Sequence, residues 1–290
     1  MMRVDAHQHF WRLARGDYGW LTPAAGALYR DFEPADLTAA LAQADVCATM
    51  LVQAAPSEAE SHFLFELARA HPFIAGVVGW VAFDAPQAPE RIRALAHASG
   101  GSLKGLRPMV QDLQDPDWLA RPALDPAFEA LIETDLVFDA LVRPRHLPAL
   151  AARLRRQPQL RAVLNHAGKP EPAAHAAARW AEQIADLART STLHCKLSGL
   201  LTEAPAGAGT AALEGIVATL FRHFGPERIL WGSDWPVVTL RASYGQWLDL
   251  ALDLVRRHAP GHEDEVFRHT AVRLYRLDVS SFAQGCSPCP

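Results

Sequence analysis

Residues 4–11 of the chain read Val4-Asp5-Ala6-His7-Gln8-His9-Phe10-Trp11, an apolar start followed by two histidines separated by one residue. Side chains two positions apart in a β-strand project from the same face, so His7 and His9 would direct both imidazoles at one point. Such a pair suits a metal ion or a polarised substrate oxygen. The same histidines could equally be polar residues in a loop, and this stretch by itself leaves both interpretations open.

A second stretch near the other end of the chain favours the functional interpretation. It reads Ile229-Leu230-Trp231-Gly232-Ser233-Asp234-Trp235-Pro236, a short apolar strand that ends in an acid. Between the two stretches, apolar strand-like segments are expected at residues 49–53, 74–81, 103–108, 136–141, 161–164 and 193–199. Helices are expected at residues 34–44, 57–71, 89–99, 126–134, 148–156, 174–189, 210–224 and 244–258, with a last helix at 263–275. Ser57 and Glu60 predict a capping box at the start of the second helix.

Eight alternations of strand and helix predict a parallel sheet, which closes naturally into a (β/α)8 TIM barrel. We expect a single barrel over residues 1–278, with an extra C-terminal helix packed on it, and a flexible tail at 279–290. An open doubly wound sheet could also hold the alternation, but only a closed barrel makes the first and last strands neighbours. Active sites of this fold lie at the carboxyl ends of the strands. Polar or aromatic candidates follow seven of the eight strands: His7 and His9, Gln53, Trp80, Arg107, His166, Lys196 and Asp234.

Composition and charge exclude several classes of protein. The chain has 290 residues, 50% of them hydrophobic and 21% charged, so a large core is available and disorder is not expected. The formal net charge is −4 and no basic block suggests nucleic acid. No apolar run reaches the ~18 residues of a membrane span, and no hydrophobic export signal begins the chain. A cytoplasmic enzyme is therefore expected.

The four cysteines divide into two pairs. Cys47 and Cys195 lie in apolar strand-like runs, which predicts buried thiols. Cys286 and Cys289 lie in the tail, where they form either a redox or metal pair or, as we favour, part of a frayed terminus.

Aromatic residues gather in the stretch that follows the first strand. Residues 12–33 contain three glycines and one proline that break regular structure, together with Tyr18, Trp20 and Tyr29. A loop of this composition indicates a lid or a pocket wall, although its aromatic side chains could simply pack on the barrel.

Three motifs resemble those of the amidohydrolase superfamily, and more narrowly those of its lactonase branch. They are Asp5-Ala-His-Gln-His-Phe-Trp, Asn165-His-Ala-Gly-Lys-Pro and Trp231-Gly-Ser-Asp-Trp-Pro, and the resemblance extends to His269-Thr270-Ala271 and Tyr275 in the last helix. It implies that His7 and His9 are the strand-one pair, His166 the strand-six histidine and Asp234 the strand-eight acid. The glycines beside His166 and Asp234 would permit a close approach.

The sequence departs from the two-metal members of that family. The fourth strand offers Lys104 and Arg107 where those members have a carboxylated lysine or a glutamate, and the fifth strand lacks their histidine. The resemblance therefore implies at most one divalent ion, zinc, held by His7, His9 and Asp234 with His166 as a fourth ligand or proton carrier. A metal-free site is the open alternative.

The implied activity is the hydrolysis of a sugar lactone, L-fuconolactone or a similar small molecule. Asp234 would take a proton from water, while His7, His9, His166 and Arg107 could polarise the carbonyl group. The expected substrate contacts are Trp11, Gln53, Trp80, Lys196 and Trp235.

Each of these assignments has a structural alternative. Arg107 could clamp a loop carboxylate, Lys196 could pair with Asp139, and the tryptophans could pack at the barrel mouth. For the whole protein, the alternatives are a metal-dependent decarboxylase of the same wider family and a barrel that binds without catalysis. The full set of three histidines and an aspartate argues against the latter, because a barrel does not need these groups to fold.

Overall fold

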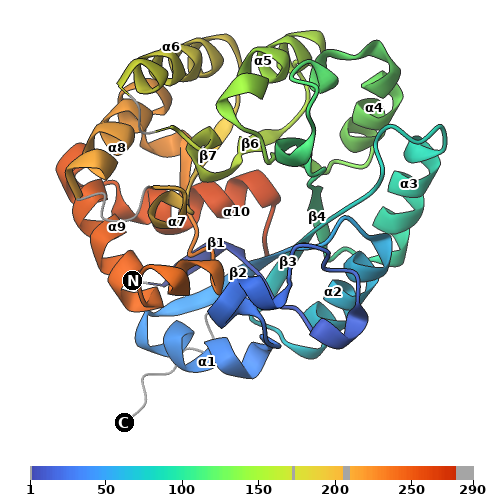
Figure 1. Ribbon diagram of the computed structural model, residues 1–290, viewed down its shortest axis with the longest axis horizontal. Coiled ribbons are helices and arrows are strands. Elements are labelled where there is room, and N and C mark those ends of the chain that lie inside the picture. Colours follow the sequence, from blue (N-terminus) through green and yellow to red (C-terminus); the bar gives the residue numbers. More distant parts are fainter. Residues whose placement is uncertain (1, 172–173, 205–209, 279–290) are drawn as a thin grey trace.

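The computed structural model of the chain describes residues 2–171, 174–204 and 210–278. Eight parallel strands form one sheet in sequence order, each hydrogen-bonded to the next, inside a ring of helices (Figure 1). The predicted (β/α)8 barrel is confirmed. The strands are β1 Arg3–Gln8, β2 Val46–Val52, β3 Ile74–Gly79, β4 Leu103–Leu106, β5 Val137–Ala140, β6 Ala162–Leu164, β7 His194–Leu197 and β8 Ile229–Trp231.

The barrel closes between β1 and the residues that follow β8. Gln8 and Trp235 form a parallel bridge, and the amide of His9 donates to the carbonyl oxygen of Trp235 at 2.7 Å. Gly232 permits this approach, because a Cβ atom at that position would lie 2.6 Å from the Cβ of His7. The role predicted for the glycine beside Asp234 is therefore confirmed.

Amphipathic helices cover the outside of the sheet and bury one face each. They are α1 Pro34–Gln43, α2 Glu58–Ala70, α3 Ala88–Ala98, α4 Asp125–Glu133, α5 Leu147–Arg156, α6 Ala174–Thr190, α8 Thr210–Phe224 and α9 Tyr244–His258. The short α7, Leu200–Glu203, lies inside this ring, directly after β7 (Figure 1). Because the period of the apolar residues decides these elements locally, the expected bounds agree with the observed ones to within one residue for most helices.

The capping box predicted at the start of α2 is only half formed. The Ser57 hydroxyl accepts a hydrogen bond from the Glu60 amide at 3.1 Å, as an N-cap does. The Glu60 carboxylate, however, accepts from the amides of Ala54 and Ala55 instead of reaching back to Ser57. Glu60 is fully buried, and it fixes the loop after β2 that borders the cavity described below.

The last helix closes the amino-terminal end of the barrel. A π-helical turn, Glu265–His269, leads into α10, Thr270–Tyr275, which lies within the ring of helices in Figure 1. Its Ala271, Leu274 and Tyr275 join the apolar residues that fill the barrel interior. Arg161, just before β6, donates to the carbonyl oxygen of Leu274 at 2.5 Å, which places α10 at the amino ends of the strands. The expected C-terminal helix is thus present, but it plugs the amino-terminal end of the barrel instead of packing on its outside.

Three further expectations concern the rest of the chain. Cys47 and Cys195 are buried thiols, as predicted. No helix in the described ranges is long and apolar enough to cross a membrane. The tail at 279–290, with Cys286 and Cys289, lies outside the described residues.

Candidate active site

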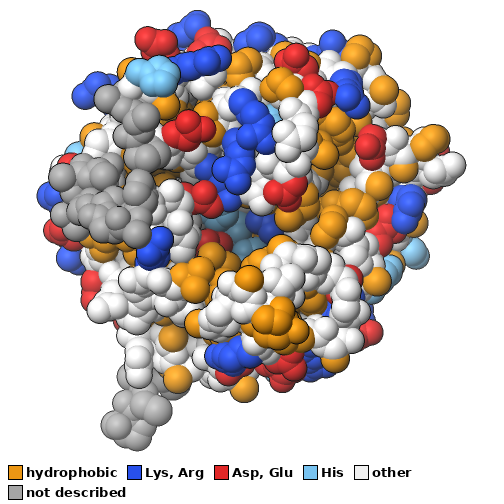
Figure 2. All heavy atoms as spheres, in the orientation of Figure 1, with side chains coloured by type: hydrophobic (Ala, Val, Ile, Leu, Met, Phe, Trp, Pro, Cys, Tyr) orange, Lys and Arg blue, Asp and Glu red, His pale blue; other side chains and the backbone are white. Residues whose placement is uncertain are grey.

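A cavity of about 300 Å³ opens at the carboxyl end of the barrel. Figure 2 shows this hollow near the centre of the face, with histidine and acidic side chains at its bottom. Several of its lining residues lie one to three positions beyond the end of a strand, as the fold requires. The lining comprises His9, Trp20, Ala54, Arg107, Met109, Gln111, Asp112, Leu141, His166, Lys169, Glu203, Asp234 and Val237.

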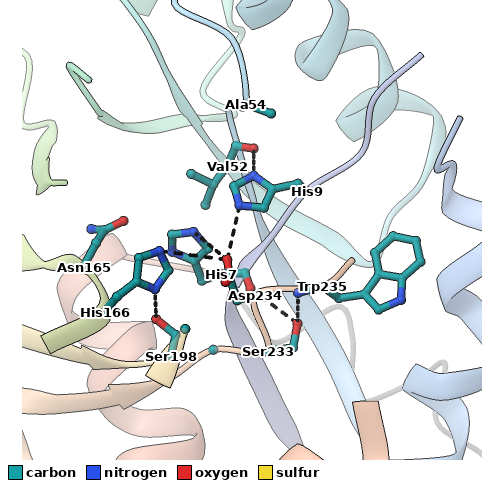
Figure 3. A network of polar contacts seen from close by, with 12 residues as sticks. His7, His9, Val52, Ala54, Asn165, His166, Ser198, Ser233, Asp234 and Trp235 are labelled. Atoms are coloured by element: carbon teal, nitrogen blue, oxygen red, sulfur yellow. Dashed lines mark hydrogen bonds and ion pairs between the residues drawn. The ribbon is translucent and has the colours of Figure 1, made fainter. Parts of the chain in front are cut away.

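Three histidines surround the carboxylate of Asp234 (Figure 3). The distances from its Oδ1 atom are 3.7 Å to Nε2 of His7, 3.5 Å to Nε2 of His9 and 3.9 Å to Nε2 of His166. All four side chains are at most 6% exposed. The structure thus brings together residues from β1, from the end of β6 and from the end of β8, as the sequence predicted.

Asp5 holds the backbone of this cluster in place. Its Oδ1 atom accepts the amides of His7 at 3.1 Å and of Ser233 at 2.8 Å, so one buried carboxylate ties β1 to the residues before Asp234. The Tyr244 hydroxyl donates to the other carboxylate oxygen at 3.0 Å. Asp5 belongs to the first motif but was not predicted to have this role, because only the closed barrel brings Ser233 and Tyr244 to it.

The donor set around Asp234 fits a divalent metal ion. His9 Nδ1 lies 2.7 Å from the carbonyl oxygen of Val52, which can only accept, so Nδ1 carries the proton and Nε2 keeps its lone pair. That lone pair faces the Asp234 carboxylate, and two acceptors face one another only with a proton or a cation between them. Ligand atoms of His7, His9 and Asp234 lie within 4.8 Å of one another. These three residues would hold the ion.

The electrostatics of the site favour neutral imidazoles beside an ionised acid. Burial lowers the pKa of His9, holds that of His7 well below its usual value and lowers that of His166 to about 3. Burial alone would raise the pKa of Asp234, but the interactions with its neighbours, above all with His166, leave the pKa below its usual value. At neutral pH, Asp234 is a carboxylate and can act as a base.

His166 reaches the cluster through a left-handed turn. The φ angles of His166, Ala167, Gly168 and Lys169 are 50°, 53°, 70° and 55°. A left-handed conformation costs about 1–2 kcal/mol for each residue that is not glycine. The indole of Trp180 donates to the carbonyl oxygen of Ala167 at 2.8 Å and supports the turn.

A glycine that the sequence did not single out packs closely against His166. A Cβ atom at Gly199 would lie 2.4 Å from His166 Nδ1. The missing side chain leaves room for that nitrogen to meet the Ser198 hydroxyl at 2.9 Å. Sequence alone pointed to Gly168, which neighbours His166 in the chain, because the contact with Gly199 exists only across β6 and β7.

Arg107 lies in the cavity wall but is anchored from behind. Its Nη2 atom donates to the carbonyl oxygen and, at 3.2 Å, to the Oε1 atom of Gln53. Its Nη1 atom lies 3.4 Å from His7 Nε2. The guanidinium therefore binds a backbone carbonyl group. Among the described residues, it does not bind the loop carboxylate that the structural alternative proposed. Its Nη1 atom is directed toward the histidine cluster.

The described lining of the cavity does not include the five residues predicted to contact substrate. Gln53 is buried against Arg107, and Trp80 is partly exposed elsewhere. Trp11 donates to the carbonyl oxygen of Arg30, and Trp235 is directed away from the histidines (Figure 3). Lys196 is buried inside the barrel, forms an ion pair with Asp139 and lies 3.3 Å from His7 Nδ1, so the alternative pairing describes its position.

Other side chains form the wall instead. Trp20 is 42% exposed, and its indole donates to the carbonyl oxygen of Ala54 at 2.8 Å. It comes from the aromatic loop that predicted a pocket wall. Lys169 belongs to the second motif but was not predicted to line the cavity. Glu203 and Met109 carried no sequence signal.

Comparisons with known proteins agree with this geometry. The amidohydrolase family matches residues 4–277. The chain is 42% identical over 283 residues to an L-fucono-1,5-lactonase of Burkholderia ambifaria, covering 96% of this chain and 97% of that protein. It is 37% identical over 298 residues to an L-fucono-1,5-lactonase of Burkholderia multivorans, covering 95% and 96%. A crystal structure of an amidohydrolase from Burkholderia multivorans with bound zinc has a TM-score of 0.88 at 36% identity, over 96% of this chain and 100% of that one.

Proposed function

The chain belongs to the amidohydrolase family, and we propose that it is a lactonase that opens a sugar 1,5-lactone, L-fucono-1,5-lactone before others. The observation that carries the proposal is the Asp234 carboxylate, which lies within 3.9 Å of the Nε2 atoms of three buried imidazoles at the floor of the cavity. A general base beside a cluster of polarising groups is what ester hydrolysis by water needs. The similarity to two L-fucono-1,5-lactonases supports this chemistry.

In the proposed mechanism, Asp234 accepts a proton from water as its oxygen attacks the lactone carbonyl. Arg107 stabilises the negative charge that develops on the carbonyl oxygen, through the Nη1 atom directed at the cluster. Asp234 then returns the proton to the ring oxygen as the carbon–oxygen bond breaks. A divalent ion held by His7, His9 and Asp234, zinc in our proposal, would polarise the carbonyl and acidify bound water. His166, close to the same carboxylate, would carry protons or complete the ligand set.

The cavity also suits a polyhydroxylated ring. Trp20, Met109 and Val237 supply apolar surface that can cover the C–H face of a sugar. The cations Arg107 and Lys169 are matched by the acids Asp112 and Glu203, so the described wall lacks the surplus of positive charge that a dicarboxylate would need.

A pH-indicator assay with a panel of lactones tests the proposal, in the presence and absence of a chelator. We expect release of acid from L-fucono-1,5-lactone well above the spontaneous rate, and loss of that activity in the Asp234→Asn variant. Release of CO₂ from an aromatic carboxylate, without lactone hydrolysis, would favour a decarboxylase. The absence of both reactions, with a lactone merely bound, would favour a non-catalytic barrel. A cytoplasmic location remains part of the proposal.

A further inference from the structure

An ion pair that the proposed hydrolysis does not use lies in the wall of the cavity. Lys169 Nζ is 2.5 Å from Glu203 Oε1, and the two side chains are 11% and 28% exposed. Both residues line the cavity together with His166 and Asp234. A ligand in this cavity can therefore reach the pair.

The backbone at both ends of the pair is constrained. Lys169 ends the left-handed turn that begins at His166, and both residues line the same cavity. Glu203 ends the short helix α7, which begins after Gly199, the residue that makes room for His166. Backbone strain of this kind gathers at functional sites, where other contacts maintain it.

The pair keeps hydrogen-bonding capacity for a ligand. An ammonium group has three donors and a carboxylate has two acceptor oxygens. In the part of the chain that the structure describes, their ion pair occupies one carboxylate oxygen, Oε1. Glu203 Oε2 can therefore accept a hydrogen bond from a ligand hydroxyl group. The remaining N–H groups of Lys169 can donate to a hydroxyl oxygen.

We infer that Lys169 and Glu203 recognise two neighbouring hydroxyl groups of the lactone ring and so determine specificity for polyhydroxylated lactones. This inference rests on the proposed function. One hydroxyl donates to Glu203 Oε2, and the other accepts from the Lys169 ammonium. A lactone without hydroxyl groups displaces water from Lys169 and Glu203 but offers them no hydrogen bonds in return. A site whose polar groups bind hydroxyl groups therefore discriminates against such an analogue.

The test compares L-fucono-1,5-lactone with δ-valerolactone, which has the same ring size and no hydroxyl groups. The measured quantity is the ratio of kcat/KM for the two lactones in the wild type and in the Lys169→Met and Glu203→Gln variants. We expect this ratio to fall at least tenfold in each variant. In the double variant, the ratio should fall little further than in the more affected single variant, because the two residues act as one unit.

Controls separate this inference from the proposed function. Glu214→Gln removes a carboxylate that pairs with Arg257 and His258 outside the cavity, and should leave the ratio unchanged. If the wild type hydrolyses neither lactone, the proposed function fails. If it hydrolyses L-fucono-1,5-lactone and the ratio is unchanged in both single variants, only the inference fails. Glu203→Gln preserves the shape of the side chain, so it remains informative if Lys169→Met does not fold.

Discussion

The Tyr275 hydroxyl donates a hydrogen bond to Asp139 Oδ2 at 2.7 Å inside the barrel. Asp139 also forms an ion pair with Lys196, whose ammonium lies 3.3 Å from His7 Nδ1. All four side chains are buried. The plug helix α10 and the histidine cluster around Asp234 are therefore linked by one chain of polar contacts through the barrel interior.

Removing the hydroxyl that anchors this chain should destabilise the fold. We expect Tyr275→Phe to lower the free energy of unfolding by about 1.5–3 kcal/mol, because a buried carboxylate oxygen loses its donor. Chemical denaturation measures the change. Tyr29→Phe is the matched control, since Tyr29 is 42% exposed. Equal losses in the two variants would contradict the role of the buried hydrogen bond.

Arg107 is expected to act in catalysis and in the fold. Arg107→Met should lower kcat/KM at least tenfold, which corresponds to about 1.4 kcal/mol of transition-state stabilisation. It should also reduce thermal stability, because the Gln53 carbonyl loses a donor. Arg107→Lys keeps the charge but lacks the planar fork, so it should recover little activity. Normal kcat/KM in folded Arg107→Met would make the residue a structural clamp alone.

Asp234 is expected to be the general base. Asp234→Asn keeps the shape of the side chain and removes its basicity, so kcat should fall by ~10²-fold or more. Lactone binding, measured by calorimetry with a slowly hydrolysed lactone, should be largely retained. Turnover close to that of the wild type would require another base.

The metal content should not exceed one divalent ion per chain. In the described part of the chain, the one group of three potential ligands within 4.8 Å is His7, His9 and Asp234. Elemental analysis after dialysis against zinc measures the ratio, and His9→Ala should abolish tight binding. Two tightly bound ions per chain would overturn the one-site assignment.

Acid should destabilise the protein partly through His194. Burial lowers the pKa of His194 from 6.5 to about 4. The unfolded chain therefore binds a proton on this residue as the pH falls below 6.5, while the folded chain does not. The contribution of neutral His194 to the free energy of unfolding is fully present above pH 6.5. It is lost progressively toward pH 4, by up to about 3 kcal/mol.

The variant His194→Gln should show a smaller loss of unfolding free energy between pH 7.5 and pH 4.5 than the wild type. His97→Gln, at an exposed position on α3, serves as the control. An unchanged pH dependence in His194→Gln would show that the other buried histidines account for the loss.

The sequence by itself determined the barrel and the cluster of three histidines around Asp234. The alternation of strands and helices follows from the period of apolar residues, which is a local property of the chain. Positions directly after parallel strands meet at one end of a barrel, so His7, His9, His166 and Asp234 could be assigned to one site without coordinates.

Only the tertiary structure decided which side chains form the cavity wall and which lie beneath it. Lys196 pairs with Asp139 inside the barrel, whereas Trp20 and Lys169 reach the cavity from a long loop and from a left-handed turn. The direction of a side chain at a strand end depends on the stagger of neighbouring strands, and a positive φ angle leaves no periodic signal in the sequence. Contacts across strands, such as that of Gly199 with His166, exist only once the barrel has closed.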